Sequence, residues 1–406
     1  MLLNQINCIT SAGLIYLFTA IAFIIGRSTR KRVPLSEAKS ILVIRLDGIG
    51  DIAMTSSMLR ELRHNCPDAE ISLVVPAVFK NMVEMCPYVD HVWGFDHRVT
   101  FRQRQVALFF RAWKWCRNTL HGRGFDWVLI PRSGSAVNAE TYISFLCKSG
   151  QQAIYSSLLS IAQRMPMPGL HIFFSHVFPN AKKQHDVESN LNMLETLGLA
   201  VQNKALELWT TQEDQHSIEG FMPSDTPCIA LGCNVSAEKR SWPIARYAET
   251  VRGLKQHNPE WMFVVVGAPQ DQAMANELIR LTGSYVFSLA GKLSLRETCS
   301  VLERCMLYVG NDSGPMHLAV AMGTPVVEIS CHPLGGNPQH FNAPERFGPY
   351  GVPNAVCRPH EPLAPCETEC SKNEAHCILL VSVKDVVNAV SSLMDVGRCQ
   401  NTKSVD

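Results

Sequence analysis

The sequence lacks an excess of charge of either sign, because its 37 lysines and arginines almost balance its 36 aspartates and glutamates, for a net charge of +1. Proteins that hold nucleic acid through its phosphates need a surplus of positive charge, so this balance argues against a nucleic-acid partner. The chain also lacks a short-period repeat and any low-complexity tract, which argues against a solenoid and against a largely disordered protein. Its 406 residues are enough for two domains with separate cores.

The first 26 residues contain no aspartate, glutamate, lysine, arginine or histidine. Residues 8–26 are mostly apolar, and as a helix they would be roughly 28 Å long, about the thickness of the hydrocarbon core of a bilayer. Four basic residues follow within residues 27–32, whereas a cleavable signal peptide carries its positive charge before the apolar stretch. We therefore expect an N-terminal transmembrane helix, with residues 27 onward in the cytoplasm by the positive-inside rule. A partly inserted helix and a wrongly assigned start codon are the alternatives.

Fifteen cysteines are scattered along the chain, and most of them lie in apolar runs. An odd number without compact spacing does not fit a disulfide framework, so we expect small buried hydrophobes in a reducing compartment. One group differs, because Cys366, Cys370 and Cys377 lie close together with His376. This spacing is not a common zinc pattern, so we expect free thiols or a local disulfide there and no metal site.

Apolar runs typical of buried parallel strands alternate with helical periodicity twice along the chain, beginning at residues 41–46 and again at residues 228–231. This alternation predicts an α/β fold of two Rossmann-like, doubly wound domains that face a cleft, the default ligand site. We expect a membrane anchor and basic flank at 1–35, an N-terminal domain at 36–205, a C-terminal domain at 206–345, and an extension with the cysteine group and a closing helix at 346–406.

The most informative run is residues 309–326, where an apolar strand leads through Asp312, Ser313 and Gly314 into a short helix of small residues. The start of a helix offers unpaired backbone N–H groups and the positive end of the helix dipole, which together suit a phosphate. His317 lies in the first turn of this helix. In isolation, a capping residue beside a buried histidine would be the better interpretation, since caps use the same residue types.

Two carboxylates, Asp47 and Asp51, flank the turn between the first predicted strand and the helix after it. Gly48 and Gly50 resemble part of a dinucleotide fingerprint, but Ala53 stands where the third glycine would be, so we expect no nucleotide on this half. One of the two carboxylates can act as a general base. Helix capping is an equally good alternative.

Two further loops carry polar residues at the ends of predicted strands. Lys239 and Arg240 follow the strand at 228–231, and two cations there suit a diphosphate. Asp271 follows Gly267, which ends another strand, and an acid in this position can accept hydrogen bonds from ribose hydroxyls. The alternatives are a solvated basic loop and a helix cap.

Taken together, these segments resemble glycosyltransferase family 9, the lipopolysaccharide heptosyltransferases, over about residues 40–395. The matching segments follow the order of the family, and they are residues 41–51, 185–188 with 197–199, 239–243, 291–295 and 311–325. The last of these is the most specific.

The resemblance implies the GT-B fold, with the donor nucleotide sugar on the C-terminal half and the acceptor on the N-terminal half. It implies that Asp51 is the catalytic base. The implied donor residues are Lys239 and Arg240 at the phosphates, Asp271 at the ribose, Asp312 at the sugar, and Ser313, Gly314 and His317 around the diphosphate. Asp47 departs from the family pattern, since many members carry a small residue there, and this leaves open which carboxylate is the base.

The chain contains no Asp-x-Asp sequence, the usual ligand of a metal-bridged diphosphate in the other common type of glycosyltransferase. We therefore expect an inverting reaction without metal or cofactor, in which Asp51 takes the proton of the acceptor hydroxyl. Lys239, His317 and the helix dipole would stabilise the leaving nucleoside diphosphate. The implied donor is ADP-heptose and the implied acceptor is a lipopolysaccharide core or related lipid-linked glycan. The alternatives are another nucleotide sugar or a non-catalytic sugar-nucleotide-binding protein.

Residues 100–120 predict an amphipathic helix with tryptophans and a basic face. The basic residues that would face the acceptor or the membrane are Arg102, Arg104, Arg111 and Lys114. Such a helix suits a membrane surface, and a core-packed helix with a solvated basic face is an equal alternative. Together with the anchor, it predicts a single-pass protein of the inner membrane with its catalytic domains in the cytoplasm.

Overall fold

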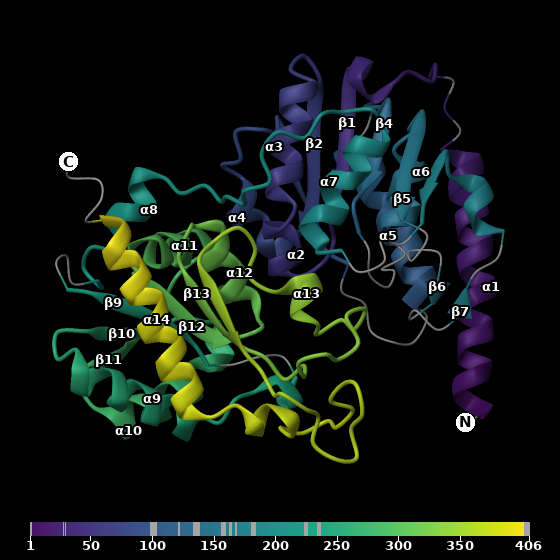
Figure 1. Ribbon diagram of the computed structural model, residues 1–406. Helices are drawn as coiled ribbons and strands as arrows, with labels where there is room; N and C mark the ends of the chain where they lie inside the picture. Colours follow the sequence, from purple (N-terminus) through teal and green to yellow (C-terminus); the bar gives the residue numbers. More distant parts are fainter. Residues whose placement is uncertain are drawn as a thin grey trace. The chain divides into compact units, whose positions relative to one another are not determined.

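The computed structural model describes residues 2–26, 28, 30–97, 104–120, 122–132, 139–155, 160–161, 165–166, 169–179, 184–222, 226–233 and 237–401. The chain divides into two compact units, which we describe one at a time (Figure 1). Unit 1 holds Met1–Lys182 and Asp186–Lys204, and unit 2 holds Lys183–His185 and Ala205–Asp406. Each unit is built around a six-stranded parallel sheet, as the alternation of strands and helices in the sequence predicts.

The sheet of unit 1 has the strand order β3-β2-β1-β4-β5-β8. The strands are β1 (Ser40–Ile44), β2 (Glu70–Pro76), β3 (His91–Phe95), β4 (Trp127–Ile130), β5 (Gln151–Tyr155) and β8 (His176–Phe178). β1 is almost wholly apolar and buried, as expected for a parallel strand that helices cover on both faces. The order reverses between β1 and β4, and ligands of open α/β sheets bind at such a point.

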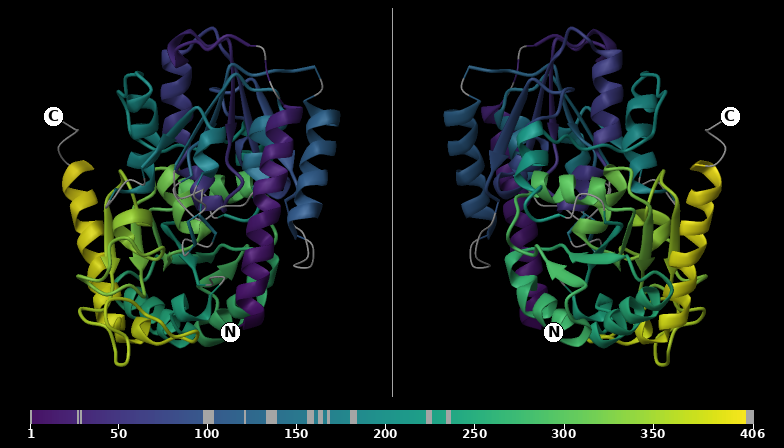
Figure 2. Two further views of the ribbon diagram at one scale, coloured as in Figure 1. Left: turned by 90° about the vertical axis from the view of Figure 1, so that its right-hand side faces the viewer. Right: turned by 90° about the vertical axis from the view of Figure 1, so that its left-hand side faces the viewer.

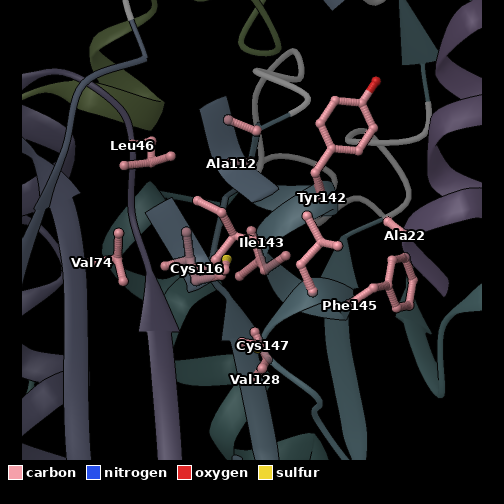
Figure 3. Close-up of a cluster of buried hydrophobic side chains, with 14 of the residues drawn as sticks. Ala22, Leu46, Val74, Ala112, Cys116, Val128, Tyr142, Ile143, Phe145 and Cys147 are labelled. Atoms are coloured by element: carbon pink, nitrogen blue, oxygen red, sulfur yellow. The ribbon is translucent and has the colours of Figure 1, made fainter. Parts of the chain in front are cut away.

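The helices of unit 1 cover this sheet. They are α1 (Leu2–Ile25), α2 (Ile49–Ala53), α3 (Ser56–Asn65), α4 (Lys80–Val83), α5 (Arg104–Thr119), α6 (Ala139–Leu146) and α7 (Asp186–Thr196), with the 3-10 helices η1 (Leu35–Glu37), η2 (Ala77–Phe79) and η4 (Leu170–Phe173). A short antiparallel pair, β6 (Ser160–Ile161) and β7 (Met165–Pro166), completes the unit. Part of the core forms where Ile143 and Cys147 meet Cys116 of α5 and Val128 of β4 (Figure 3).

The sheet of unit 2 repeats this topology with the order β11-β10-β9-β12-β13-β14. The strands are β9 (Cys228–Gly232), β10 (Met262–Val265), β11 (Val286–Ser288), β12 (Leu307–Asn311), β13 (Val326–Ile329) and β14 (Asn354–Cys357). The order reverses between β9 and β12, so the loops after these two strands occupy the position that the loops after β1 and β4 occupy in unit 1.

The helices of unit 2 include three short 3-10 turns. Within the described residues, these helices are α8 (Gln212–Ser217), η5 (Glu238–Arg240), α9 (Ile244–His257), η6 (Pro269–Asp271), α10 (Gln272–Thr282), α11 (Leu295–Arg304), α12 (Gly314–Ala321), α13 (Pro344–Phe347), η7 (Cys377–Leu380) and α14 (Val383–Asn401). α14 packs on α9 and β14, and its Val386 and Val390 are buried in the core of this unit.

The N-terminal helix differs from the transmembrane anchor predicted from the sequence. No helix within the described residues is both long and apolar enough to cross a membrane, so the predicted transmembrane anchor is wrong. Instead, α1 packs on α5 and α6. Its Ile15, Phe18 and Ala22 are buried in the core of unit 1. The Phe18 ring stacks on Phe109 of α5 at a centroid distance of 4.7 Å, and Figure 2 shows α1 beside α5.

The basic amphipathic helix predicted near residues 100–120 is α5. It buries Leu108, Phe109, Ala112 and Cys116 in the core of unit 1. Its other face carries the exposed Phe110, Arg111, Trp113, Lys114 and Arg117. Arg102 lies outside the described residues, and so does the side chain of Arg104. The core-packed interpretation therefore holds for one face, while the other face combines aromatic and basic side chains.

The packing of α1 predicts that substitutions at two neighbouring positions differ in their effect on the free energy of unfolding. Phe18→Ala removes a buried ring and should lower the free energy of unfolding by about 3–5 kcal/mol, as other large-to-small core substitutions do. Leu17→Ala changes a side chain that is 52% exposed, and it should cost no more than about 0.5 kcal/mol. Chemical denaturation of the two variants measures both values. Equal and small effects would show that α1 does not pack on unit 1 in this way.

Candidate active site

A buried arginine organises the carboxyl end of β1. Arg45 follows the last residue of β1 and is only 1% exposed. Its guanidinium lies 2.7 Å from Asp186 Oδ2, 2.9 Å from Asp47 Oδ2 and 3.3 Å from Asp51 Oδ1. Although burial alone lowers the pKa of Arg45, Asp186, Asp47 and Asp51 together raise it. The site therefore contains a permanent cation that holds three carboxylates.

Asp47 belongs to the interior of unit 1. Its side chain is 4% exposed and forms ion pairs with Arg45 and Arg132. Arg132 also pairs with the buried Glu140 at 3.1 Å. Burial raises the pKa of Asp47 to about 6, although Arg132 and Arg45 act to lower it. Asp47 therefore links β1 to the segment after β4, a structural role.

Asp51 lies in the first turn of α2 and is more accessible, with 32% of its side chain exposed. One carboxylate oxygen accepts a hydrogen bond from the backbone N–H of Gly48 at 3.0 Å. The other oxygen faces Arg45. Both interactions orient the carboxylate, so the capping alternative is realised, yet a third of the side chain can still meet a substrate.

The second group of polar residues lies where β12 leads into α12 in unit 2. Arg240 of η5 donates to Asp312 Oδ2 at 3.1 Å and to the Asp312 carbonyl oxygen at 3.2 Å. The His317 Nε2 atom is 3.8 Å from Asp312 Oδ1. Ser313 occupies the N-cap position of α12, but its side chain makes no capping hydrogen bond. The side-chain cap favoured for this motif in isolation is therefore not the arrangement found.

Lys239 has different direct partners from its neighbour Arg240. Its Nζ donates to the Cys370 carbonyl oxygen at 3.3 Å and lies 5.3 Å from the centre of the Phe341 ring. The structure thus brings together Arg240, Asp312 and His317, whereas Lys239 is held by the loop that carries the cysteine group.

Sequence comparison assigns the chain to a family. The sequence model described as "Glycosyltransferase family 9 (heptosyltransferase)" matches residues 159–376, more than half of the chain. The chain belongs to glycosyltransferase family 9. The family predicted from the motifs is thereby confirmed, and the protein is a glycosyltransferase.

Individual relatives and solved structures agree with this assignment. The lipopolysaccharide core heptosyltransferase OpsX of Haemophilus influenzae is 21% identical over 77% of this chain and 82% of its own. Lipopolysaccharide heptosyltransferase 1 of Campylobacter coli is 24% identical over 75% and 86%. The family 9 glycosyl transferase of Veillonella parvula superposes with a TM-score of 0.71 at 19% identity, covering 90% of this chain and 99% of its own. Escherichia coli heptosyltransferase WaaC with ADP gives 0.64 at 20% identity, over 87% and 99%.

Several buried residues of this family 9 glycosyltransferase support the strand end that carries Asp312 and were missed from the sequence. Tyr247 donates its hydroxyl hydrogen to Asn311 Oδ1 at 2.9 Å, and the Trp242 backbone N–H approaches the same oxygen at 3.4 Å. Glu328 of β13 is fully buried, and burial together with the charge of Asp312 raises its pKa well above its ordinary value. Glu328 is a polar residue within an otherwise apolar strand, and this pattern is the sequence signal that could have identified it as a supporting residue.

The glycines at the ends of β9 and β12 make room for a side chain of the protein itself. Gly232 and Gly310 are register partners in the sheet. A Cβ atom at Gly232 would overlap the Tyr308 hydroxyl, and one at Gly310 would lie 2.6 Å from the Gly232 carbonyl oxygen. Gly310 directly precedes the specific motif of the family, but its contacts here are with Tyr308 and the neighbouring strand.

Asp271 shows the capping role that the sequence left open. Its Oδ2 accepts from the Ala268 backbone N–H at 2.7 Å, which closes a capping box at η6. A pocket of about 750 Å³ lies nearby along β11 and α10, where Gln272, Ser288 and Lys292 line it. Neither Asp312 nor His317 lines this pocket.

The buried Glu140 predicts a pH dependence of stability. Burial raises its pKa to about 8, although Arg132 lowers it, while the unfolded chain has the ordinary value of about 4.3. Between these values the folded protein holds a proton that the unfolded chain has lost, so the free energy of unfolding should fall as the pH rises from about 5 to 8. Glu140→Gln should flatten this decline in denaturation midpoints measured across that range.

A matched control is Glu37→Gln, which changes an exposed carboxylate of the same unit. Its curve of stability against pH should run parallel to that of the wild type. A Glu140→Gln curve that also runs parallel would mean that Glu140 is ionised in the folded protein throughout this range.

Proposed function

We propose that this enzyme transfers a heptose from ADP-heptose to a lipopolysaccharide core or related lipid-linked glycan, with inversion at the sugar. Several relatives are named lipopolysaccharide heptosyltransferases, and two structures of a family member carry ADP or an ADP-heptose analogue. The observation that carries the proposal is the oriented, part-exposed carboxylate of Asp51 in unit 1, combined with the Arg240, Asp312 and His317 group in unit 2.

Asp51 is the proposed base, and Asp47 is the proposed brace. An inverting transfer needs one group that removes the proton from the attacking hydroxyl. Asp51 has the exposure for this task, and its contacts with Gly48 and Arg45 hold it in one orientation. Asp47 lies between two arginines in the interior, so its charge serves the fold.

The donor diphosphate is proposed to bind at the start of α12. Ser313, Gly314 and the backbone N–H groups of the first turn suit phosphate oxygens, and His317 and Lys239 supply positive charge as the leaving group departs. Asp312, held by Arg240, would contact the sugar, and Asp271 the ribose. We propose that the reaction itself needs neither a metal ion nor a cofactor.

Two isosteric substitutions distinguish the proposed roles of Asp51 and Asp47. Asp51→Asn keeps the shape of the side chain and removes the base, so the rate of heptose transfer from ADP-heptose should fall by about a hundredfold or more, while ADP binding measured by calorimetry stays unchanged. Asp47→Asn should instead lower the free energy of unfolding, because it removes one carboxylate partner from both Arg45 and Arg132. The fraction of this variant that folds should retain most of the transfer activity.

If Asp47→Asn abolished transfer and Asp51→Asn did not, Asp47 would be the base. Full activity in Asp51→Asn would remove the proposed mechanism. Binding of ADP-heptose without any turnover by the wild type, with a panel of lipid-linked acceptors, would favour the non-catalytic alternative.

We further propose that a lipid-linked acceptor is met at an exposed surface of unit 1 formed by α1 and α5. Leu17, Ile24 and Ile25 of α1 are between 50 and 70% exposed, and Phe110 and Trp113 of α5 are 54 and 38% exposed. Phe18 contacts Phe110 edge-on at 6.5 Å, so the two helices adjoin. The exposed Phe110 and Trp113 share α5 with the exposed Arg111, Lys114 and Arg117. Apolar and basic side chains together suit the surface of an anionic bilayer.

This surface predicts lipid-dependent binding. The full chain should bind vesicles that contain anionic phospholipid, and Lys114→Glu should weaken that binding roughly tenfold or more, since each positive charge near such a surface contributes about 1 kcal/mol. Lys80→Glu makes the same charge change at an exposed position on α4 and should have little effect. Vesicle co-sedimentation at fixed ionic strength measures both, and equal losses in the two variants would rule out a specific surface.

A further inference from the structure

The four residues of the cysteine group converge on one point in unit 2. The ligand atoms of Cys366, Cys370, His376 and Cys377 all lie within 4.8 Å of one another. The three cysteines are 8, 2 and 0% exposed and form a buried cluster of their own. All three are free thiols. The spacing in the sequence predicts free thiols or a disulfide with no metal, whereas the fold gathers the four side chains into a preformed set of metal ligands.

The distances inside the group match a tetrahedral metal site. The His376 Nδ1 atom is 3.4 Å from Cys377 Sγ, 3.6 Å from Cys366 Sγ and 4.0 Å from Cys370 Sγ. Bonds of about 2.3 Å to sulfur and 2.0–2.1 Å to nitrogen in a tetrahedron place the ligand atoms roughly 3.5–3.8 Å apart. The Ser371 backbone N–H also donates to Cys366 Sγ at 3.3 Å, the kind of outer hydrogen bond that orients metal ligands.

The segment that carries Cys366, Cys370 and His376 has no regular secondary structure. Residues 358–376, between β14 and η7, contain no helix or strand, and loops of this length are uncommon in compact domains without a further constraint. We propose that Cys366, Cys370, His376 and Cys377 bind one thiophilic metal ion, with Zn²⁺ the ion that three thiolates and one imidazole fit best. Four protein ligands complete the tetrahedron, so the site is structural and leaves no position for a substrate.

Three contacts link residues 368–370 of this segment to other parts of unit 2, and one of them involves Lys239. The Cys370 carbonyl oxygen accepts from Lys239 Nζ at 3.3 Å. The Glu369 carboxylate lies 3.3 Å from His340 Nε2, and the Thr368 carbonyl oxygen accepts from the Asn337 backbone N–H at 3.1 Å. A bound ion would therefore fix the position of a partner of Lys239. Only this effect on Lys239 rests on the proposed function. The metal site itself is inferred from its four ligands alone.

The direct test is the metal content of the full chain, purified under reducing conditions without chelator and without a metal-affinity tag. Elemental analysis should find about one zinc, or one iron in its place, per chain. Cys370→Ala and Cys377→Ala should lower this content at least about tenfold. Cys357→Ala is the matched control, because Cys357 is a buried cysteine at the end of β14, directly before this segment and outside the group, and the metal content of this variant should match the wild type.

Cobalt substitution gives a second readout that does not depend on the variants folding. Co²⁺ added to the metal-free wild type should produce thiolate-to-metal charge-transfer bands and the strong visible bands of tetrahedral coordination. A reduced wild-type protein that holds far less than one metal per chain and gives no such spectrum would overturn the proposal. So would a disulfide among the three cysteines in freshly isolated protein, detected by mass spectrometry. Neither result bears on heptose transfer, which is measured separately.

Discussion

Unit 1 depends on the charge of Arg45, a guanidinium at the end of the central strand with almost no access to water. Burying a cation is costly unless carboxylates surround it, and three of them do so here. Each comes from a different element, because Asp47 lies in the turn after β1, Asp51 in α2 and Asp186 in α7. The same interaction that compensates the buried charge therefore fixes the helix that closes the unit and the carboxylate proposed to act on the acceptor.

Unit 2 supports the end of β12 with hydrogen bonds between uncharged groups. There, the amide of Asn311 accepts from Tyr247 and donates to the Ile329 carbonyl oxygen. The charged pair of Arg240 and Asp312 lies one residue further out and is partly accessible. This division suits the proposed roles, since a rigid neutral support leaves the charged groups available to an anionic ligand, whereas in unit 1 Arg45 is buried together with Asp47 and Asp186.

Sequence patterns predicted the two α/β units and the family, because hydrophobic periodicity and strand-end motifs are local. They failed where the outcome depended on partners distant in the sequence. The uncharged N-terminus was predicted to span a membrane, yet Phe18 and Ala22 pack against α5 and α6, and composition alone does not reveal such a partner. Asp186 stood in a matching segment, but nothing local indicated its contact with Arg45. The spacing of the three clustered cysteines is unusual, and only the fold shows that their sulfur atoms converge.

The two glycines that accommodate Tyr308 have a consequence for how this protein can diverge. A glycine near a nucleotide-binding strand end is commonly credited to the ligand, but here Gly232 and Gly310 are constrained by a neighbouring aromatic ring. Among homologues, Gly232 and Tyr308 should therefore change together. A lineage that replaces the tyrosine with a small residue releases Gly232, whereas Gly310 stays constrained by the Gly232 carbonyl oxygen, and one that keeps the tyrosine has to keep both glycines, whatever sugar nucleotide its enzyme uses.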